Sequence, residues 1–166
     1  MLAQRRPAPS ATLNGHLYLN GSPADATALR RISAYVEQED ALIGSLTVRE
    51  TLEFAARLSL PTSLKAPIRQ QRVQSLLKAF GLGDQADDLI GTPVRKGISG
   101  GQKRRLSVAS QLITGPKILF LDEPTSGLDS AAAFEVVRFL KDLVKHHNVC
   151  THDTFDRRGG ADQTSS

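Results

Sequence analysis

Two acidic residues follow directly behind a short apolar run late in the chain. The run extends from Ile118 to Leu121, and Asp122 and Glu123 come next. Four consecutive apolar residues predict a strand buried on both faces of a sheet, and open α/β sheets bind ligands at the carboxyl ends of their strands. An aspartate there can hold Mg²⁺, usually through water, and a glutamate can polarise an attacking water. The pair indicates a hydrolytic site, and the alternative is a buried strand that meets a polar loop.

A second stretch with phosphate-binding chemistry lies upstream. It consists of Ser99, Gly100, Gly101 and Gln102. The two glycines let a phosphate approach the backbone closely, and Ser99 can donate its hydroxyl. A helix beginning here offers N–H groups with a partial positive charge. The alternative is a flexible loop followed by a solvated basic face, because Lys103, Arg104 and Arg105 come next.

The order of these motifs resembles that of the ATP-binding cassette (ABC) superfamily. Residues 99–102 resemble its signature motif, Ile118–Glu123 its Walker B motif and Ser126–Asp129 its D-loop, while Gln38 resembles its Q-loop glutamine. The resemblance extends over residues 1–149. Residues 47–52, 104–109 and 122–130 are most similar to the G subfamily of eukaryotic transporters, which includes half-size and pleiotropic drug resistance members.

The resemblance implies that ATP and Mg²⁺ are the cofactors. Glu123 would be the catalytic residue, and Asp122 and Gln38 would hold Mg²⁺ through water. The implied nucleotide-binding residues are Ser99, Gly100, Gly101, Gln102, Gln38 and Asp129. In dimers of this superfamily, ATP lies between the Walker A loop of one subunit and the signature motif of the other. The implied partners are therefore a second nucleotide-binding domain and a transmembrane domain, and not nucleic acid.

Two parts of the family pattern are missing from the sequence. No Gly-x-x-x-x-Gly-Lys-Ser/Thr occurs, and that Walker A loop wraps the phosphates. In the family it lies just upstream of a stretch resembling residues 1–6, so we expect the chain to begin inside the following helix.

The second missing part is the strand that carries the switch histidine, because residues 148–151 are too short and too polar. His152 also lacks the usual following Gln-Pro, so we assign it no switch role. We therefore do not expect an autonomous ATPase.

The resemblance stops near residue 149, and a truncated gene, a retained intron and a frameshift would each explain this. We expect residues 150–166 to form a divergent, disordered tail. The missing strands would also leave the strand Ile118–Leu121 without neighbours, so independent folding is in doubt. His146, His147, Cys150 and His152 match no zinc-binding spacing.

Local patterns predict the elements that position the motifs. Two Asn-Gly pairs at 14–15 and 20–21 predict a β-hairpin region, followed by a short helix at 25–31 and a strand at 32–36. Thr47 and Glu50 have the capping-box spacing at a helix start. Further helices are predicted to begin at Pro67, after Ser99 and after Asp129. On the last helix we expect one apolar side, formed by Phe134, Val137, Leu140 and Val144.

These elements predict an α/β fold: an incomplete P-loop NTPase core of the ABC ATPase type, with an N-terminal β-hairpin region and a helical subdomain. The partial nucleotide-binding domain covers residues 1–149, and the helical subdomain covers about 42–113. We also expect Pro124 to keep Glu123 out of the helical region and the strand end extended.

Composition narrows the class of protein. The 166 residues are 40% apolar and 23% charged, which is typical of a globular domain. The single cysteine, Cys150, excludes an internal disulfide framework and fits a reducing compartment. Apolar runs are far shorter than the roughly 20 residues of a membrane span, and the first residues lack a signal peptide core. We expect a soluble chain held at the cytoplasmic face of a membrane through its parent transporter.

Three functions stay open on the sequence. The favoured one is the ATP-hydrolysing domain of a G-subfamily transporter, present as a fragment, whose parent exports lipids, sterols or xenobiotics. The second is a catalytically inactive interaction protein that supplies the signature motif to an intact domain. The third is a soluble ABC protein of translation or DNA repair, based on the basic residues at 95–96 and 103–105.

Overall fold

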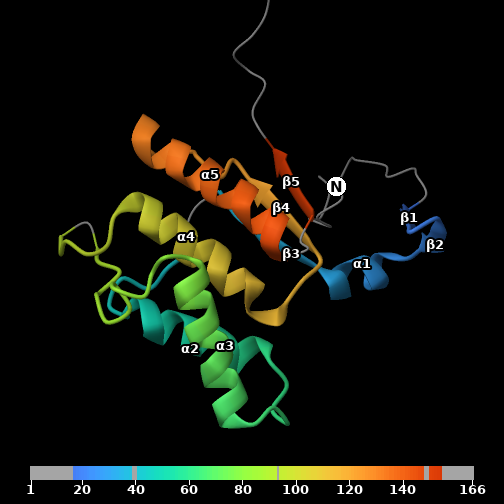
Figure 1. Ribbon diagram of the computed structural model, residues 1–166, viewed down its shortest axis with the longest axis horizontal. Coiled ribbons are helices and arrows are strands. Elements are labelled where there is room, and N and C mark those ends of the chain that lie inside the picture. The colour runs from blue at the N-terminus through green and yellow to red at the C-terminus, as the bar shows by residue number, and fades with distance from the viewer. Residues whose placement is uncertain (1–16, 39–40, 93, 148–149, 155–166) are drawn as a thin grey trace, which may run out of the picture.

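The computed structural model describes residues 17–38, 41–92, 94–147 and 150–154. A parallel sheet, a group of helices and a small hairpin make up this part of the chain (Figure 1). The elements in chain order are β1 (Leu17–Leu19), β2 (Ser22–Ala24), α1 (Ala26–Ile32), β3 (Ser33–Val36), α2 (Val48–Ser59), α3 (Ala66–Ala79), α4 (Gly100–Gln111), η1 (Leu112–Thr114), β4 (Ile118–Asp122), α5 (Ser130–His147) and β5 (Cys150–Thr154). The α/β fold predicted from the sequence is confirmed.

Strand β4 forms the centre of a three-stranded parallel sheet in the order β3-β4-β5. Leu119 and Leu121 are fully buried, as expected for an apolar strand covered on both faces. The expectation that this strand lacks neighbours is wrong, because β3 pairs with it on one side and β5 on the other. Its backbone groups therefore have partners along both edges.

Strand β5 corrects the expectation of a disordered tail from residue 150. Cys150–Thr154 pairs with β4 in register, so that Cys150 lies opposite Ile118 and Thr154 opposite Asp122. A strand at the edge of the described sheet needs to complete hydrogen bonds on one side only, so a short polar segment is sufficient. In this register His152 pairs with Phe120 in the middle of the strand, whereas the residue that pairs with Asp122 is Thr154. Residues 155–166 lie outside the described part of the chain.

The predicted helix starts are confirmed at their caps. The Thr47 hydroxyl accepts from the Glu50 backbone at 3.2 Å, and the Glu50 carboxylate accepts from the Thr47 backbone at 2.8 Å. Pro67 lies in the first turn of α3. The helices α4 and α5 lie beside the sheet, α4 against β3 and α5 against β5, with α2 and α3 farther out (Figure 1).

The apolar side of α5 differs from the predicted one. Leu140 is buried as expected, but its buried neighbours are Val136 and Leu143, while Phe134 is 70% exposed. Apolar residues occur on both sides of this helix, so the sequence periodicity fits two faces. The contact that fixes the face comes from α3: the rings of Phe80 and Phe139 lie 4.5 Å apart.

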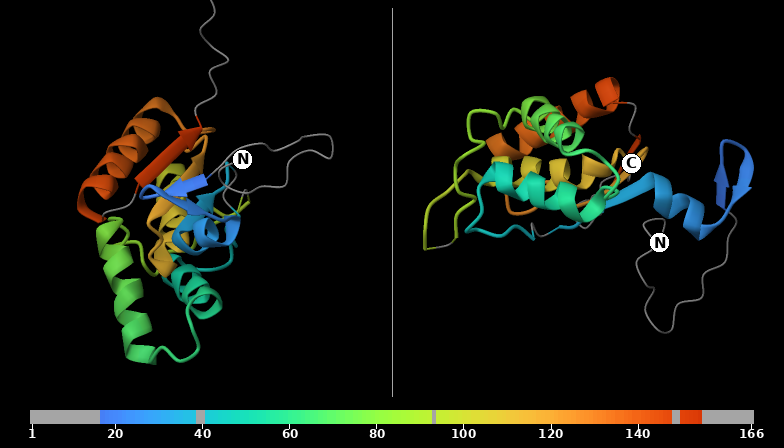
Figure 2. Two further views of the ribbon diagram at one scale, coloured as in Figure 1. Left: turned by 90° about the vertical axis from the view of Figure 1, so that its right-hand side faces the viewer. Right: turned by 90° about the horizontal axis from the view of Figure 1, so that it is seen from below.

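The hairpin β1–β2 is antiparallel and turns at Asn20 and Gly21, which have positive φ angles of 50° and 80°. This agrees with the prediction for the second Asn-Gly pair; the first, at 14–15, lies outside the described residues. The hairpin lies beyond α1 at one end of the molecule (Figure 2). Within the described ranges, no helix is long and apolar enough to cross a membrane.

Candidate functional site

The carboxyl ends of β3 and β4 bring two predicted site residues together. Gln38 follows β3, and Glu123 follows β4, whose parallel pairing places Val36 opposite Leu121. The Gln38 side-chain amide donates to the Glu123 carboxylate over 2.5 Å and also lies 3.3 Å from the Ser126 hydroxyl. A glutamine and a glutamate from distant parts of the sequence thus meet at one sheet edge.

Asp122 lies beside this pair at the last position of β4. Its carboxylate accepts a hydrogen bond from the hydroxyl of Tyr35, on the neighbouring strand β3. Tyr35 was not among the predicted site residues, since no local pattern pairs it with a residue of another strand. Because the Gln38 nitrogen faces Glu123, its amide oxygen is the atom left for a cation. Carboxylate and amide oxygens are ligands that suit Mg²⁺, so the donor set fits this ion.

The backbone at Glu123 is left-handed, with φ of +40°. The prediction of an extended strand end is therefore wrong at this residue, although Pro124 does exclude the right-handed helical region. The Glu123 carbonyl accepts from the Ser126 backbone at 3.0 Å, which closes a turn. A left-handed conformation costs a residue with a side chain on the order of 1 kcal/mol. The surrounding contacts must hold Glu123 in this geometry.

Residues 99–102 form the start of α4 as predicted. The Ser99 hydroxyl accepts from the Gln102 backbone at 3.2 Å, and the Gln102 side chain accepts from the Ser99 backbone at 2.8 Å. A hydroxyl that accepts one hydrogen bond can still donate its own hydrogen. Ser99 and Gly100 are exposed, so a ligand can reach this helix start.

The two glycines of this stretch also pack against the segment that follows β4. A Cβ on Gly100 would lie 3.1 Å from the Leu128 side chain, and one on Gly101 would lie 3.6 Å from the Ala132 Cβ. Asp129 caps α5, because its carboxylate accepts from the backbone of Ala131 at 3.0 Å and Ala132 at 2.9 Å. The structure thus places the helix start at 99–102 beside the loop that contains Asp129.

Arg104 is a second site residue, besides Tyr35, that was not predicted. It belongs to α4 and is only 3% exposed, so the alternative of a solvated basic face is wrong for this residue. Its guanidinium donates to main-chain carbonyl oxygens of Glu37, Gln38, Asp122, Glu123 and Pro124, at 2.6, 3.2, 3.0, 3.4 and 3.0 Å. The helical spacing gave one indication that Arg104 is buried, because Gly101 and Val108 lie on the same face of the helix and are themselves buried.

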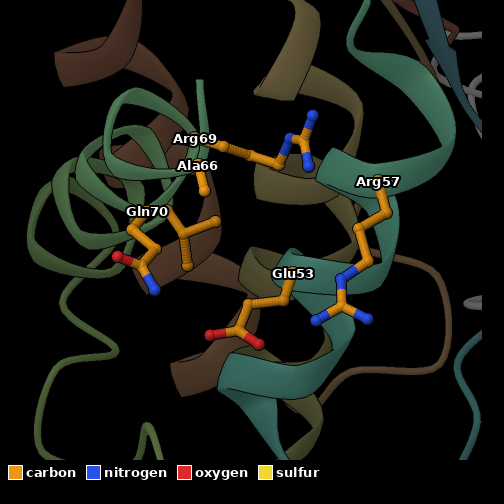
Figure 3. Close-up of a pocket in the computed structure, with 6 residues that line it drawn as sticks. Glu53, Arg57, Ala66, Arg69 and Gln70 are labelled. Carbon is orange, nitrogen blue, oxygen red and sulfur yellow. The ribbon is translucent and has the colours of Figure 1, made fainter. Parts of the chain in front are cut away.

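A shallow pocket lies elsewhere, between α2 and α3 (Figure 3). Its volume is about 100 Å³, and it is lined by Glu53, Arg57, Ala66, Arg69, Gln70 and Val73. Arg69 Nε is buried there without a hydrogen-bond partner among the described residues. The predicted site residues do not line this pocket, so the candidate site is the open sheet edge around Gln38 and Glu123.

Comparison with known proteins identifies the family. The model of the family described as ABC transporter matches residues 4–126. The chain belongs to the ABC transporter family. Within it, ABC transporter G family member 24 of Dictyostelium discoideum is 51% identical over 134 residues, 81% of this chain and 12% of that protein. The broad substrate specificity ATP-binding cassette transporter ABCG2 of Mus musculus is 46% identical over 133 residues, 80% of this chain and 20% of that protein.

The fold of this ABC chain is similar to a solved structure, cbiO1 from Clostridium perfringens, described as part of the ABC transporter complex cbiONQ. The TM-score is 0.71 at 25% identity, covering 92% of this chain and 58% of the other. Together these similarities assign the chain to the nucleotide-binding domain of the G subfamily. The chain spans only about an eighth to a fifth of the length of these two G-family relatives.

Proposed function

We propose that the chain forms part of the ATP-hydrolysing domain of a G-subfamily transporter that exports lipids, sterols or xenobiotics. The observation that carries the proposal is the contact of Gln38 with Glu123 at the sheet edge, beside Asp122. A carboxylate oriented by an amide next to a Mg²⁺-binding aspartate is suited to activating water. The similarity to two G-family transporters supports the transport role.

Each residue has a defined role in this proposal. Asp122 and Gln38 hold Mg²⁺ through water, and Glu123 takes a proton from the attacking water. Bound Mg²⁺ would neutralise charge on the phosphates. Of the nucleotide-binding set, Ser99, Gly100, Gly101 and Gln102 contact ATP held by the Walker A loop of a second nucleotide-binding domain. Gln38 belongs to the chain's own site with Asp122 and Glu123, and Asp129 lies beside the helix start at 99–102. The helix start at Ser99 supports this role, because the Ser99 hydroxyl is exposed and a helix N-terminus favours phosphate oxygens.

The proposed partners are that second nucleotide-binding domain and a transmembrane domain, with the chain at the cytoplasmic face of the membrane. The identity to G-family transporters supports both partners. Nucleic acid is disfavoured by the position of Arg104, because this arginine of the basic stretch is buried against main-chain oxygens and does not face solvent.

The test is ATP hydrolysis by a hybrid protein that adds a Gly-x-x-x-x-Gly-Lys-Ser/Thr segment upstream and a switch strand downstream of these residues. We expect Mg²⁺-dependent hydrolysis that falls by about 100-fold or more in Glu123→Gln, since a general base contributes at least that much. Glu135→Gln, on the exposed side of α5, is the matched control and should hydrolyse at the wild-type rate. If Glu123→Gln and wild type hydrolysed ATP at equal rates, Glu123 would not be the catalytic residue.

A second candidate function is a non-catalytic interaction protein that docks on an intact domain through residues 99–102. The observation that favours it is the exposure of Ser99 and Gly100 at the start of α4. Co-purification of the chain with an intact nucleotide-binding domain in Mg²⁺ and ATP, lost in Ser99→Ala, would support it. Absence of the complex would leave the transporter domain as the only candidate of the two.

A further inference from the structure

We infer that Arg104 is a positioning residue that sets the distance between Gln38 and Glu123 by holding the main chain behind both. The inference rests on the proposed function and adds to it a residue that was not among the predicted site residues. Arg104 lies on α4, and none of the residues that it holds belongs to that helix. Gln38 and Glu123, whose distance it sets, follow β3 and β4 at the sheet edge where hydrolysis is proposed.

The hydrogen bonds of Arg104 join two separate segments. One side of the guanidinium, Nη1, donates to Glu37 at 2.6 Å and to Gln38 at 3.2 Å. The other nitrogens donate to the end of β4 and the residues directly after it: Nη2 to Asp122 at 3.0 Å and Glu123 at 3.4 Å, and Nε to Pro124 at 3.0 Å. All five acceptors are main-chain carbonyl oxygens, so Arg104 fixes the backbone from which the Gln38 and Glu123 side chains extend.

The chemistry of arginine suits this task better than that of lysine. A guanidinium is planar and always charged, and it presents five donors in a rigid fork, whereas an ammonium is one point with three rotatable donors. Only the fork can reach both segments at once. Burial strengthens these bonds, because water does not compete with the carbonyl oxygens.

The strained backbone at Glu123 needs such support. Its φ of +40° is unfavourable for a residue with a side chain, and Arg104 donates to the carbonyls on both sides of it, those of Asp122 and Pro124. A guanidinium that binds the residues before and after Glu123 keeps the turn closed. Without it, the Glu123 side chain would leave the position where it meets Gln38.

The first test uses the chain itself and needs no activity. In ¹⁵N-labelled protein, the side-chain amide signal of Gln38 should move when Glu123 is changed to Gln, because the two groups are in contact. In Arg104→Met we expect that signal to lie at the position of a solvent-exposed glutamine and to stop responding to the Glu123→Gln change. Arg104→Lys should give a partial response.

Arg105→Met is the matched control. This arginine is next on the same helix, but its guanidinium lies near the end of α3. Its Nη1 atom is 3.5 Å from the position that a Cβ on Gly81 would take. The Gln38 signal should be unchanged in this variant. A folded Arg104→Met protein whose Gln38 signal still responds to Glu123→Gln would overturn the inference. Loss of the folded circular dichroism spectrum in both Arg104→Met and Arg104→Lys would also overturn it, because Arg104 would then act on global stability.

The second test measures kinetics in the hybrid protein described above. We expect Arg104→Met to lower kcat by about 100-fold with little change in KM for ATP, since a misplaced catalytic group costs about that much. Arg104→Lys should recover part of kcat. A wild-type hybrid that does not hydrolyse ATP, combined with the expected Gln38 signals, would refute the proposed function and leave the role of Arg104 in place. An unchanged kcat in Arg104→Met, with an active wild type, would refute the positioning role.

Discussion

The side-chain amide of Gln38 lies 2.5 Å from the carboxylate of Glu123, across 85 positions of sequence. Two parallel strands that end side by side create this contact: Gln38 lies two residues after β3, and Glu123 directly follows β4. The contact gives Glu123 an orientation that an exposed glutamate would not keep alone.

Replacing Gln38 with Ala should lower kcat of the ATP-hydrolysing hybrid by about 10-fold. Losing one hydrogen bond to a charged group costs about 1.5 kcal/mol, which corresponds to a factor of ten in rate. Steady-state ATPase kinetics measure this change. Gln70→Ala, on the exposed surface of α3, is the control, and a kcat for Gln38→Ala equal to that of Gln70→Ala would contradict the orienting role.

Replacing Tyr35 with Phe should lower the free energy of unfolding by about 1–2 kcal/mol, because it removes the hydrogen bond from its hydroxyl to the Asp122 carboxylate. Urea unfolding followed by circular dichroism measures the change. Tyr18→Phe offers a matched control, since Tyr18 is 60% exposed in the hairpin. Equal stabilities of the two variants would show that the Tyr35 hydroxyl contributes nothing to folding.

A proline placed in β5 should lower the free energy of unfolding by different amounts at adjacent positions. Cys150 N–H donates to the Lys117 carbonyl at 2.9 Å, and alternate residues of a parallel strand bond to the same neighbour. The N–H of His152 therefore also faces β4, while that of Thr151 faces away. We expect His152→Pro to lower the free energy of unfolding by about 1–3 kcal/mol more than Thr151→Pro. Thermal or urea unfolding of both variants measures the difference, and equal losses would reject the register of β5.

The ion pair of Arg49 and Asp87 predicts a pH dependence of stability. Their Nε and Oδ1 atoms lie 2.9 Å apart. The hydrogen bond from Arg49, helped by its charge, holds the pKa of Asp87 below its ordinary value. A carboxyl with a lowered pKa stabilises the fold above its unfolded pKa of about 4 and loses that contribution as the pH falls through the folded value.

Asp87→Asn should therefore be slightly less stable than wild type at pH 7, and the difference should shrink to zero as the pH falls well below 4. Asp87 is fully exposed, so solvent screening keeps the effect small. Urea unfolding at several pH values measures it, with Asp84→Asn as the control from the same exposed loop. A difference that stayed constant down to low pH would exclude the ion pair as its cause.

Local signals in the sequence predicted the helix starts well. Thr47 and Ser99 are followed three positions later by Glu50 and Gln102, and both capping boxes are formed. Such pairs depend on neighbouring residues only, so spacing is sufficient to predict them. The resemblance to a known family placed Gln38 and Glu123 in one site, and their contact agrees with that placement.

Long-range contacts account for what the sequence did not predict. The basic residues around Arg104 look like a solvated face, and its acceptors are main-chain oxygens, which leave no mark in a sequence. Strand β5 was missed because an edge strand needs little apolar character. The buried side of α5 was misplaced because it depends on the contact of Phe139 with Phe80 of another helix.

The order of the strands in the sheet has a consequence for how the chain folds during synthesis. Strand β3 is made before α2, α3 and α4, whereas its partner β4 and the outer strand β5 are made after them. The helices between them, α2 to α4, can pack together on the ribosome, whereas the complete three-stranded sheet can form only after residue 154 has left the exit tunnel. At about 5–20 residues per second, β3 spends several seconds unpaired. That interval is when a chaperone would have the most surface to bind.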